Sequence, residues 1–164
     1  MASRITFILG TVLSFMAFSP VAAQDLQKGA IAALAGDYAT AIKEWTPLAE
    51  AGNASALFNL GYIYHKGLGV PQDYAEAVKW YRLAAEQGLA HAQNSLGFMY
   101  EAGRGVVQDN VMAHMWYNIA SANGHEGAGA RRDKTASLMI LAATEKAQAM
   151  ARECMSSGYT KCGY

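Results

Sequence analysis

The sequence repeats itself with a period of 36 residues. Apolar, aromatic and small residues recur in register, most completely in two copies that follow one another in the middle of the chain. A fixed period of about 20–50 residues indicates an array of stacked units, because one unit cannot bury its apolar face alone. Such arrays fold as solenoids whose long surface holds partners, so the repeat predicts a binding protein. The recurring positions are Ala41, Ala77 and Ala113; Trp45, Tyr81 and Tyr117; Gly52, Gly88 and Gly124; and Ala56, Ala92 and Ala128.

Each copy is predicted to form two helices. Asp73 is a good N-cap, and apolar residues follow it at helical spacing up to about Gln87. Gly88 can then adopt the left-handed conformation that ends a helix. The second helix is predicted over 90–102. The two glycines of Gly103-Arg104-Gly105-Val106 indicate a turn with positive φ angles after it.

The first full copy carries the motif Leu60-Gly61-x-x-Tyr64-x-x-Gly67-x-Gly69-Val70-x-x-Asp73-x-x-x-Ala77-x-x-Trp80-x-x-x-Ala84-Ala85-x-x-Gly88. This motif closely resembles the Sel-one-like repeat, a longer-loop relative of the tetratricopeptide repeat. The second copy, Leu96-Gly97 through Gly124, resembles it as well, with Ser121 in place of the second Ala. The period predicts an all-α fold, a right-handed α/α superhelical solenoid of about four helix-turn-helix repeats.

The period divides the chain into five segments. Residues 1–23 are a predicted signal peptide, residues 24–52 a tetratricopeptide-like hairpin, and residues 53–88 and 89–124 two Sel-one-like repeats. Residues 125–164 are predicted to hold a degenerate repeat and a C-terminal capping helix with a tethered tail. Helices are expected over 125–138 and 144–157, but no Gly or Pro marks the break, so one longer helix is the alternative.

The N-terminus has the pattern of a secretory signal. Arg4 precedes an apolar run from Ile5 to Phe18, and small residues lead to a predicted cleavage between Ala23 and Gln24. The run is shorter than the ~20 apolar residues of a spanning helix. The alternative is a buried or interfacial N-terminal helix. Cleavage places the protein in the periplasm or outside the cell, without a transmembrane segment.

Both cysteines lie near the C-terminus, at Cys154 and Cys162. Export puts them in an oxidising compartment, where two nearby thiols normally pair, so a disulfide is predicted. The alternative is a redox-active or nucleophilic cysteine, but the spacing is not that of a C-x-x-C motif. After signal cleavage the formal charge changes from zero to −1, since Arg4 is lost. A near-neutral chain lacks the basic footprint of nucleic-acid binding.

By analogy with tetratricopeptide proteins, the helix carrying Leu-Gly-x-x-Tyr lines the concave face of the solenoid. Residues at steps of three and four on the side away from the core are the candidates for partner binding. Aromatic and polar side chains mixed in this way suit protein recognition. The alternative is that Phe58 and Phe98 only pack between neighbouring repeats. The predicted partner-binding residues are Ser55, Phe58, Tyr62 and His65 in the first copy, and His91, Asn94, Phe98 and Glu101 in the second.

The function predicted from these residues is an exported, monomeric adaptor that binds a protein partner in the cell envelope. The resemblance implies a scaffolding or regulatory role in an envelope complex. One alternative is a binder of cell-wall saccharide such as peptidoglycan, with Tyr62 and Phe98 as stacking platforms. Another is a β-lactam or cell-wall hydrolase, since secreted members with a cysteine pair in every repeat have been linked to β-lactams. This chain lacks those pairs and a Ser-x-x-Lys motif, so we expect no enzyme.

No cofactor or metal is expected. The four histidines do not pair at the spacing of four residues that places two ligands on one helix face, and no thiol is predicted to be free. They are expected on different elements or at opposite helix ends: His65, His91, His114 and His125.

Overall fold

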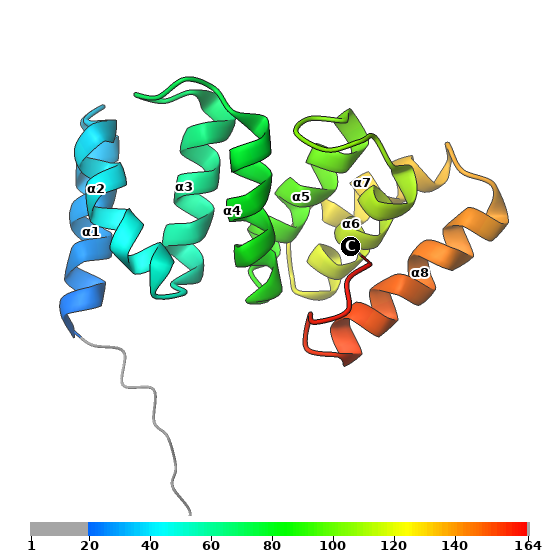
Figure 1. The fold of residues 1–164 in the computed structure, drawn as a ribbon. Helices are drawn as coiled ribbons and strands as arrows, with labels where there is room; N and C mark the ends of the chain where they lie inside the picture. Colours follow the sequence, from blue (N-terminus) through cyan, green and yellow to red (C-terminus); the bar gives the residue numbers. More distant parts are fainter. Residues whose placement is uncertain (1–19, 164) are drawn as a thin grey trace, which may run out of the picture.

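The computed structural model describes residues 20–163, with side chains from Asp25 onward. This part of the chain consists of α-helices joined by turns, without a strand. The helices follow one another along an elongated array, with α1 and α2 at one end and α8 at the other (Figure 1). The predicted all-α solenoid is therefore confirmed. The helices are α1 (Pro20–Leu34), α2 (Tyr38–Glu50), α3 (Ala54–Lys66), α4 (Tyr74–Glu86), α5 (Ala90–Ala102), α6 (Asn110–Ala122), α7 (Ala128–Ala136) and α8 (Leu141–Ser156).

The residues that begin and end the helices also recur every 36 residues. Asp37, Asp73 and Asp109 each accept a hydrogen bond from the backbone N–H three residues later, at 3.0, 2.9 and 3.1 Å. These N-caps start α2, α4 and α6. At the other end, α3 and α5 stop at Gly67 and Gly103, both left-handed with φ of 67° and 63°. The same local signals therefore start and stop the same helices in each copy.

A glycine in each first helix of a hairpin lets an aromatic ring of the second helix lie against its backbone. A Cβ at Gly61 would stand 2.7 Å from the ring of Tyr81. A Cβ at Gly97 would stand 2.7 Å from the ring of Tyr117. Both rings are buried, so the two helices of a hairpin approach closely around a filled aromatic core.

Gly29 occupies the same place in the first hairpin, where its backbone faces the ring of Trp45. Gly29 and Gly61 are 32 residues apart, because the α1–α2 turn is shorter than the α3–α4 turn. Structural counterparts in α1 and α3 are therefore 32 residues apart rather than 36. By this register Ala33 of α1 corresponds to His65 of α3.

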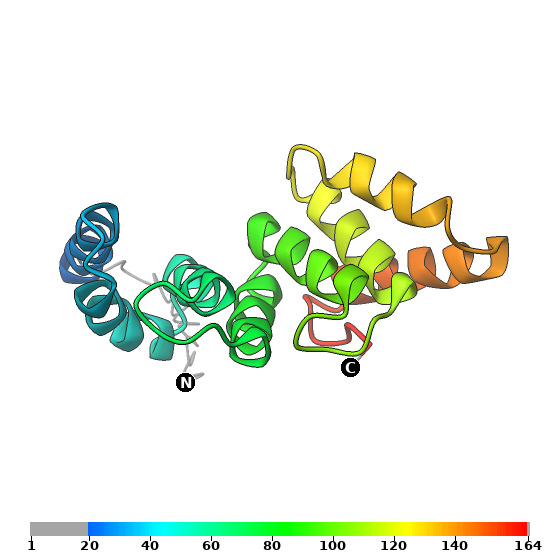
Figure 2. The same ribbon diagram turned by 90° about the horizontal axis from the view of Figure 1, so that it is seen from above.

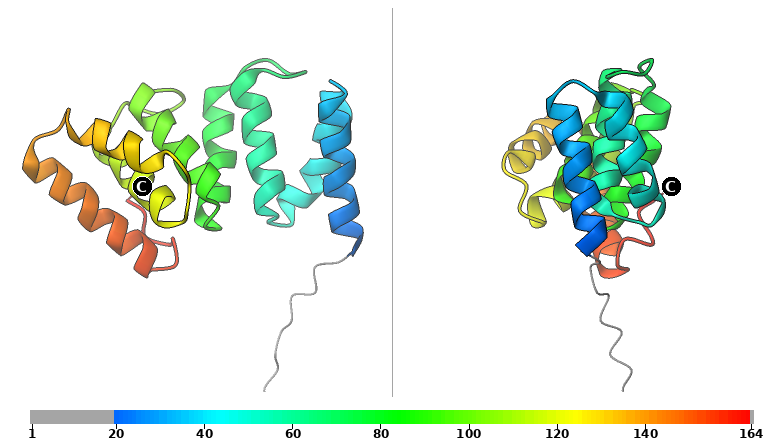
Figure 3. Two further views of the ribbon diagram at one scale, coloured as in Figure 1. Left: turned by 180° about the vertical axis from the view of Figure 1, so that it is seen from behind. Right: turned by 90° about the vertical axis from the view of Figure 1, so that its left-hand side faces the viewer.

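The last two helices depart from the hairpin pattern. Residues 125–157 hold two helices, α7 and α8, rather than one long helix. Both pack against α6, and they diverge from each other instead of lying side by side (Figure 3). Seen from above, α7 and α8 close the end of the array that lies farthest from α1 (Figure 2). The C-terminal helix that was expected to cap the array is α8, and it packs against α6.

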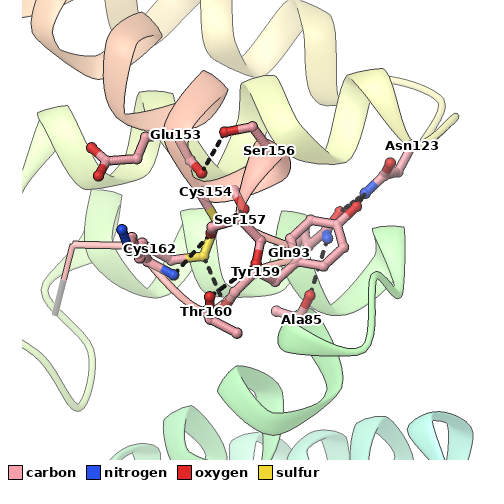
Figure 4. Close-up of a disulfide and its surroundings, with 11 residues drawn as sticks. Ala85, Gln93, Asn123, Glu153, Cys154, Ser156, Ser157, Tyr159, Thr160 and Cys162 are labelled. Atoms are coloured by element: carbon pink, nitrogen blue, oxygen red, sulfur yellow. Dashed lines mark hydrogen bonds between the residues drawn. A yellow bond between two sulfur atoms is a disulfide. The ribbon is translucent and has the colours of Figure 1, made fainter.

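The C-terminal tail is fastened to the array by a disulfide and by hydrogen bonds (Figure 4). The predicted bridge between Cys154 and Cys162 is present, and both residues are buried. Within the loop that it closes, the Tyr159 hydroxyl accepts a hydrogen bond from the Asn123 amide at 2.8 Å. The same amide donates to the Gln93 side-chain oxygen at 2.9 Å. Because Gln93 is fully buried on α5, the tail ties the end of α6 to α5.

The predicted signal peptide falls largely outside the described residues, which leave out positions 1–19. Helix α1 begins at Pro20 and runs through the predicted cleavage position without a break. Among the helices of residues 20–163, none combines the length and the apolar character needed to cross a membrane.

Candidate functional site

The eight predicted partner-binding residues lie on α3 and α5, and the surface that they form is named the α3–α5 face. Four of them form two ring–ring contacts between α3 and α5. The rings of Phe58 and His91 meet edge to face with centroids 6.1 Å apart. The rings of His65 and Phe98 stack with centroids 5.9 Å apart. Phe58 and Phe98 are half-buried in these contacts, as in the alternative that they pack between repeats.

A hollow of about 470 Å³ lies beside this face, where α3 meets the first hairpin. Small and apolar side chains of α1, namely Ala33 and Leu34, form one wall, and Leu34 is 90% exposed. Trp45, Asn59 and Tyr62 line it from α2 and α3. Its volume falls in the range of about 300–1,000 Å³ that is usual for binding pockets. Tyr62 is 45% exposed and belongs both to the hollow and to the α3–α5 face.

The hollow has a clear structural origin in the register of α1 against α3. In the next unit, His65 fills the corresponding place, with its Nδ1 3.2 Å from the Tyr81 hydroxyl and its ring against Phe98. In the first unit that place belongs to Ala33, whose single methyl group leaves the space open. One substitution between repeats thus turns a packed contact into a pocket.

A cluster of rings and cations continues the face from the hollow towards α5. The Arg104 guanidinium lies over the rings of Phe98 and Tyr74, at 5.2 and 5.3 Å from their centroids. The Lys66 ammonium lies 5.8 Å from the centroid of Tyr62. These distances are those of cation–π contacts, which orient a side chain without neutralising its charge.

The glycine loop between α5 and α6 positions Arg104. Gly105, the next residue, has a φ of 72°, and a Cβ there would run into the backbone of Tyr74 at the start of α4. The loop therefore presses directly on α4, and this contact sets Arg104 above the rings. In the preceding copy the position of Arg104 is taken by Leu68, which lines the hollow.

The positive charge of this region resides on Lys66 and Arg104. Both side chains are exposed, and neither forms an ion pair with any carboxylate in the described part of the chain. Burial lowers the pKa of His65 below its usual value, and the charges of Lys66 and Arg104 lower it further. His65 is therefore neutral at pH 7, because its pKa falls below that of a free imidazole.

Neighbouring carboxylates have other partners. The Glu101 carboxylate accepts a hydrogen bond from the Tyr117 hydroxyl at 2.6 Å, which is the counterpart of the contact between His65 and Tyr81 one repeat earlier. Burial raises the pKa of Tyr117, and its hydrogen bond to Glu101 raises it further, so the hydroxyl stays a donor. Two more acidic side chains near the start of α4 are also engaged: Asp73 caps the helix, and Glu76 pairs with Lys79 at 2.6 Å.

The other end of the face carries a second ring pair. His91 contacts His125 with ring centroids 5.0 Å apart, which extends the row from Phe58 to the start of the last repeat. Burial lowers the pKa of His125, and the neighbouring His91 adds to this. The Nδ1 atom of His125 and the Oδ1 atom of Asn94 are buried without a hydrogen-bond partner in the described structure. Of the remaining predicted residues, Ser55 is exposed at the start of α3.

Sequence reasoning missed several residues of this region. Arg104 and Lys66 lie in a loop and at a helix end, which the helical spacing did not include. Nothing in the sequence could show the hollow, because it depends on the register of α1 against α3. Within residues 25–163, no group of three or more His, Cys, Asp or Glu side chains is arranged to hold a metal ion.

Comparison with known proteins agrees with this geometry. The profile of the Sel1 repeat matches residues 54–89 and 90–125, which are the units built from α3–α4 and α5–α6. A Sel1 repeat protein from Oxalobacter formigenes is similar in structure, with a TM-score of 0.63 and 35% sequence identity. The similarity covers 69% of this chain and 88% of that protein. The chain belongs to the Sel1 repeat family. Sel1 repeat proteins are typically protein-interaction scaffolds, and this solenoid fold is generally non-catalytic.

A second Sel1-like structure is a protective antigen present in uropathogenic Escherichia coli strains, which displays an SLR fold. It superimposes with a TM-score of 0.78 and 30% identity over 84% of this chain. This chain spans only 31% of the length of that antigen. Comparison with curated protein sequences gives no match.

Proposed function

We propose that this Sel1 repeat protein is an exported, monomeric adaptor that binds a protein partner with its α3–α5 face and works in a complex of the cell envelope. The observation that carries the proposal is the hollow beside Tyr62 together with the exposed ring itself. A concave apolar pocket with a few polar groups at its rim is the form that anchors a partner's side chain. The other predicted residues, from Ser55 to Glu101, extend the proposed site along α3 and α5.

Export is supported by the signal pattern of residues 1–23 and by the disulfide. Disulfides form and persist in oxidising compartments and are rare in the reducing cytosol. The bridge between Cys154 and Cys162 is buried in the described structure and fastens the tail to α8. A protein that carries such a bridge fits the periplasm or the outside of the cell.

The alternative of a saccharide binder needs two accessible rings as stacking platforms. Phe98 is stacked on His65 and covered by Arg104, so Tyr62 is the ring that remains accessible of the two. A mixed surface with the exposed Tyr62 ring and an apolar hollow beside it favours a protein partner over a flat sugar chain.

The test is crosslinking in the intact envelope, with Tyr62→Ala compared with the natural chain. Leu83→Ala is the matched control, because Leu83 is 46% exposed but lies on α4 and outside the face. We expect one specific protein to be captured by the natural chain and by Leu83→Ala, and to be lost with Tyr62→Ala. Capture that survives in Tyr62→Ala places the site elsewhere. Capture of no protein, with sedimentation on purified cell wall, supports the saccharide binder instead.

A further inference from the structure

We propose that the segment bound by this protein is acidic and carries one large apolar side chain, with the apolar group in the hollow beside Tyr62 and the acidic groups next to Lys66 and Arg104. This inference rests on the proposed function and names the chemistry of its partner. The adjoining surface is continuous, since Tyr62 lines the hollow and also lies under the Lys66 ammonium.

Charge complementarity selects an acidic partner. Lys66 and Arg104 both lie close enough to His65 to affect its titration, and the described residues give neither of them an ion pair. Exposed cations elsewhere in the described chain, such as Lys146 on α8, also lack an ion pair, but Lys66 and Arg104 are the two that lie against the rings of the α3–α5 face. The positive charge at this place is therefore uncompensated, although the protein as a whole has no net charge. Uncompensated charge at a binding surface favours partners of the opposite sign.

The cations are also held in place in advance. Arg104 lies over two rings, and the loop that carries it rests on the backbone of Tyr74 through Gly105. Lys66 lies over Tyr62 in the last turn of α3. A side chain that is already oriented loses less conformational entropy when it binds a carboxylate. The rings beneath the cations leave their outer N–H groups free to donate to a partner.

The hollow selects an apolar anchor. Its lining is formed by Ala33, Leu34, Trp45 and the ring of Tyr62, with Asn59 as a polar group. None of the described residues that line it carries a charge. Leu34, which lines the hollow, is 90% exposed, so an apolar side chain also stands at the rim. Large apolar side chains that enter such a pocket supply most of the affinity at an interface.

The experiment starts with selection of binders from a random peptide library on the purified protein, followed by fluorescence anisotropy with the enriched peptide. We expect enrichment of Asp and Glu next to one aromatic or long aliphatic residue. The variant Lys66→Gln/Arg104→Gln should bind this peptide about tenfold more weakly, since two charged contacts at an exposed surface together contribute about a factor of ten to the affinity. Arg104→Lys keeps the charge and should stay close to the natural affinity.

The hollow is tested separately with Ala33→His, which copies the residue of the next repeat and fills the space. Binding should fall about tenfold or more, as for loss of an anchor. The control Lys146→Gln/Arg152→Gln removes the same two charges from the exposed surface of α8, and binding should not change. Circular dichroism and urea midpoints of all variants separate lost binding from lost folding.

Several outcomes would overturn the inference. Enrichment of basic or uncharged peptides contradicts it, and so does full binding by Lys66→Gln/Arg104→Gln. Binding of phosphatidylglycerol vesicles through the same two cations, with no peptide enriched, would make the surface a lipid site. A partner captured in the envelope that depends on Tyr62 but not on the two cations leaves the adaptor function standing and refutes only the inference. If neither a peptide nor a partner is found, both proposals fail.

Discussion

Replacing Gly105 by Ala tests whether the glycine loop holds the repeats together through backbone contact. Gly105 has a φ of 72°, and its missing Cβ points into the first turn of α4. The carbonyl group of Tyr74 lies nearest, and the amide nitrogen of Ala75 would be 2.7 Å from a Cβ. These are backbone atoms of a helix and cannot swing aside as a long side chain can. Ala at this position must therefore displace the loop or the helix.

The magnitude has two parts. A left-handed conformation costs an L-residue about 1–2 kcal/mol relative to Gly. Overpacking against fixed atoms adds about 1–3 kcal/mol. Gly124 isolates the first part, because its φ is 86° and a Cβ there would meet no atom within 4 Å. We therefore expect Gly124→Ala to lower the free energy of unfolding by about 1–2 kcal/mol and Gly105→Ala by about 2–5 kcal/mol.

The assay is urea unfolding followed by tryptophan fluorescence, since Trp45 and Trp116 are buried in the array. A change in stability shifts the midpoint at an unchanged slope, whereas a changed slope indicates loss of cooperative unfolding. Equal destabilisation by Gly105→Ala and Gly124→Ala would falsify the argument, because it would leave the backbone contact with no energetic role. The same Gly105→Ala protein should also bind the acidic peptide more weakly, since the loop carries Arg104.

Three further predictions concern the tail and the histidines. Reduction of the bridge between Cys154 and Cys162 should lower the free energy of unfolding by about 2–3 kcal/mol, as expected for a short loop; an unchanged urea midpoint with reductant present would contradict this. The substitution Tyr159→Phe should lower the free energy of unfolding by about 1 kcal/mol, because the hydrogen bond from Asn123 is lost. Tyr38→Phe is the control, because the described structure shows no hydrogen bond to the Tyr38 hydroxyl. The free energy of unfolding should also fall as the pH drops from 7 towards about 5. The pKa values of His65, His114 and His125 are lowered in the folded state, so the unfolded chain takes up protons first. A urea midpoint that stays constant over this range would contradict the burial of these three side chains.

The helices and their ends could be predicted from the sequence because their signals are local. Asp73 caps a helix through an N–H only three residues away, and Gly103 ends one through its own backbone conformation. The disulfide was predictable for the same reason, since two cysteines in a short segment have one partner each. The break between α7 and α8 carried no such signal, and the sequence left it open.

The candidate site was predictable only in part. Helical spacing placed Tyr62 and the pairs of Phe58 with His91 and His65 with Phe98 on one side, because the repeat fixes which residues of successive helices align. Whether those residues bind a partner stays a prediction. Spacing could not tell an exposed ring from one covered by a neighbour, so Tyr62 and Phe98 looked alike in sequence.

The sequence alone determined that this chain is a helical array, because the period of 36 residues indicates stacked like units and the apolar spacing within each unit is that of helices. Only the tertiary structure decided where that array is open. The shorter α1–α2 turn moves the counterpart of His65 to a position 32 rather than 36 residues earlier, so Ala33 takes the place beside α3 that His65 takes beside α5. The hollow follows from this pairing, because the methyl group of Ala33 leaves open the space that the ring of His65 fills one unit later, and the pairing shows only when the helices are aligned in space.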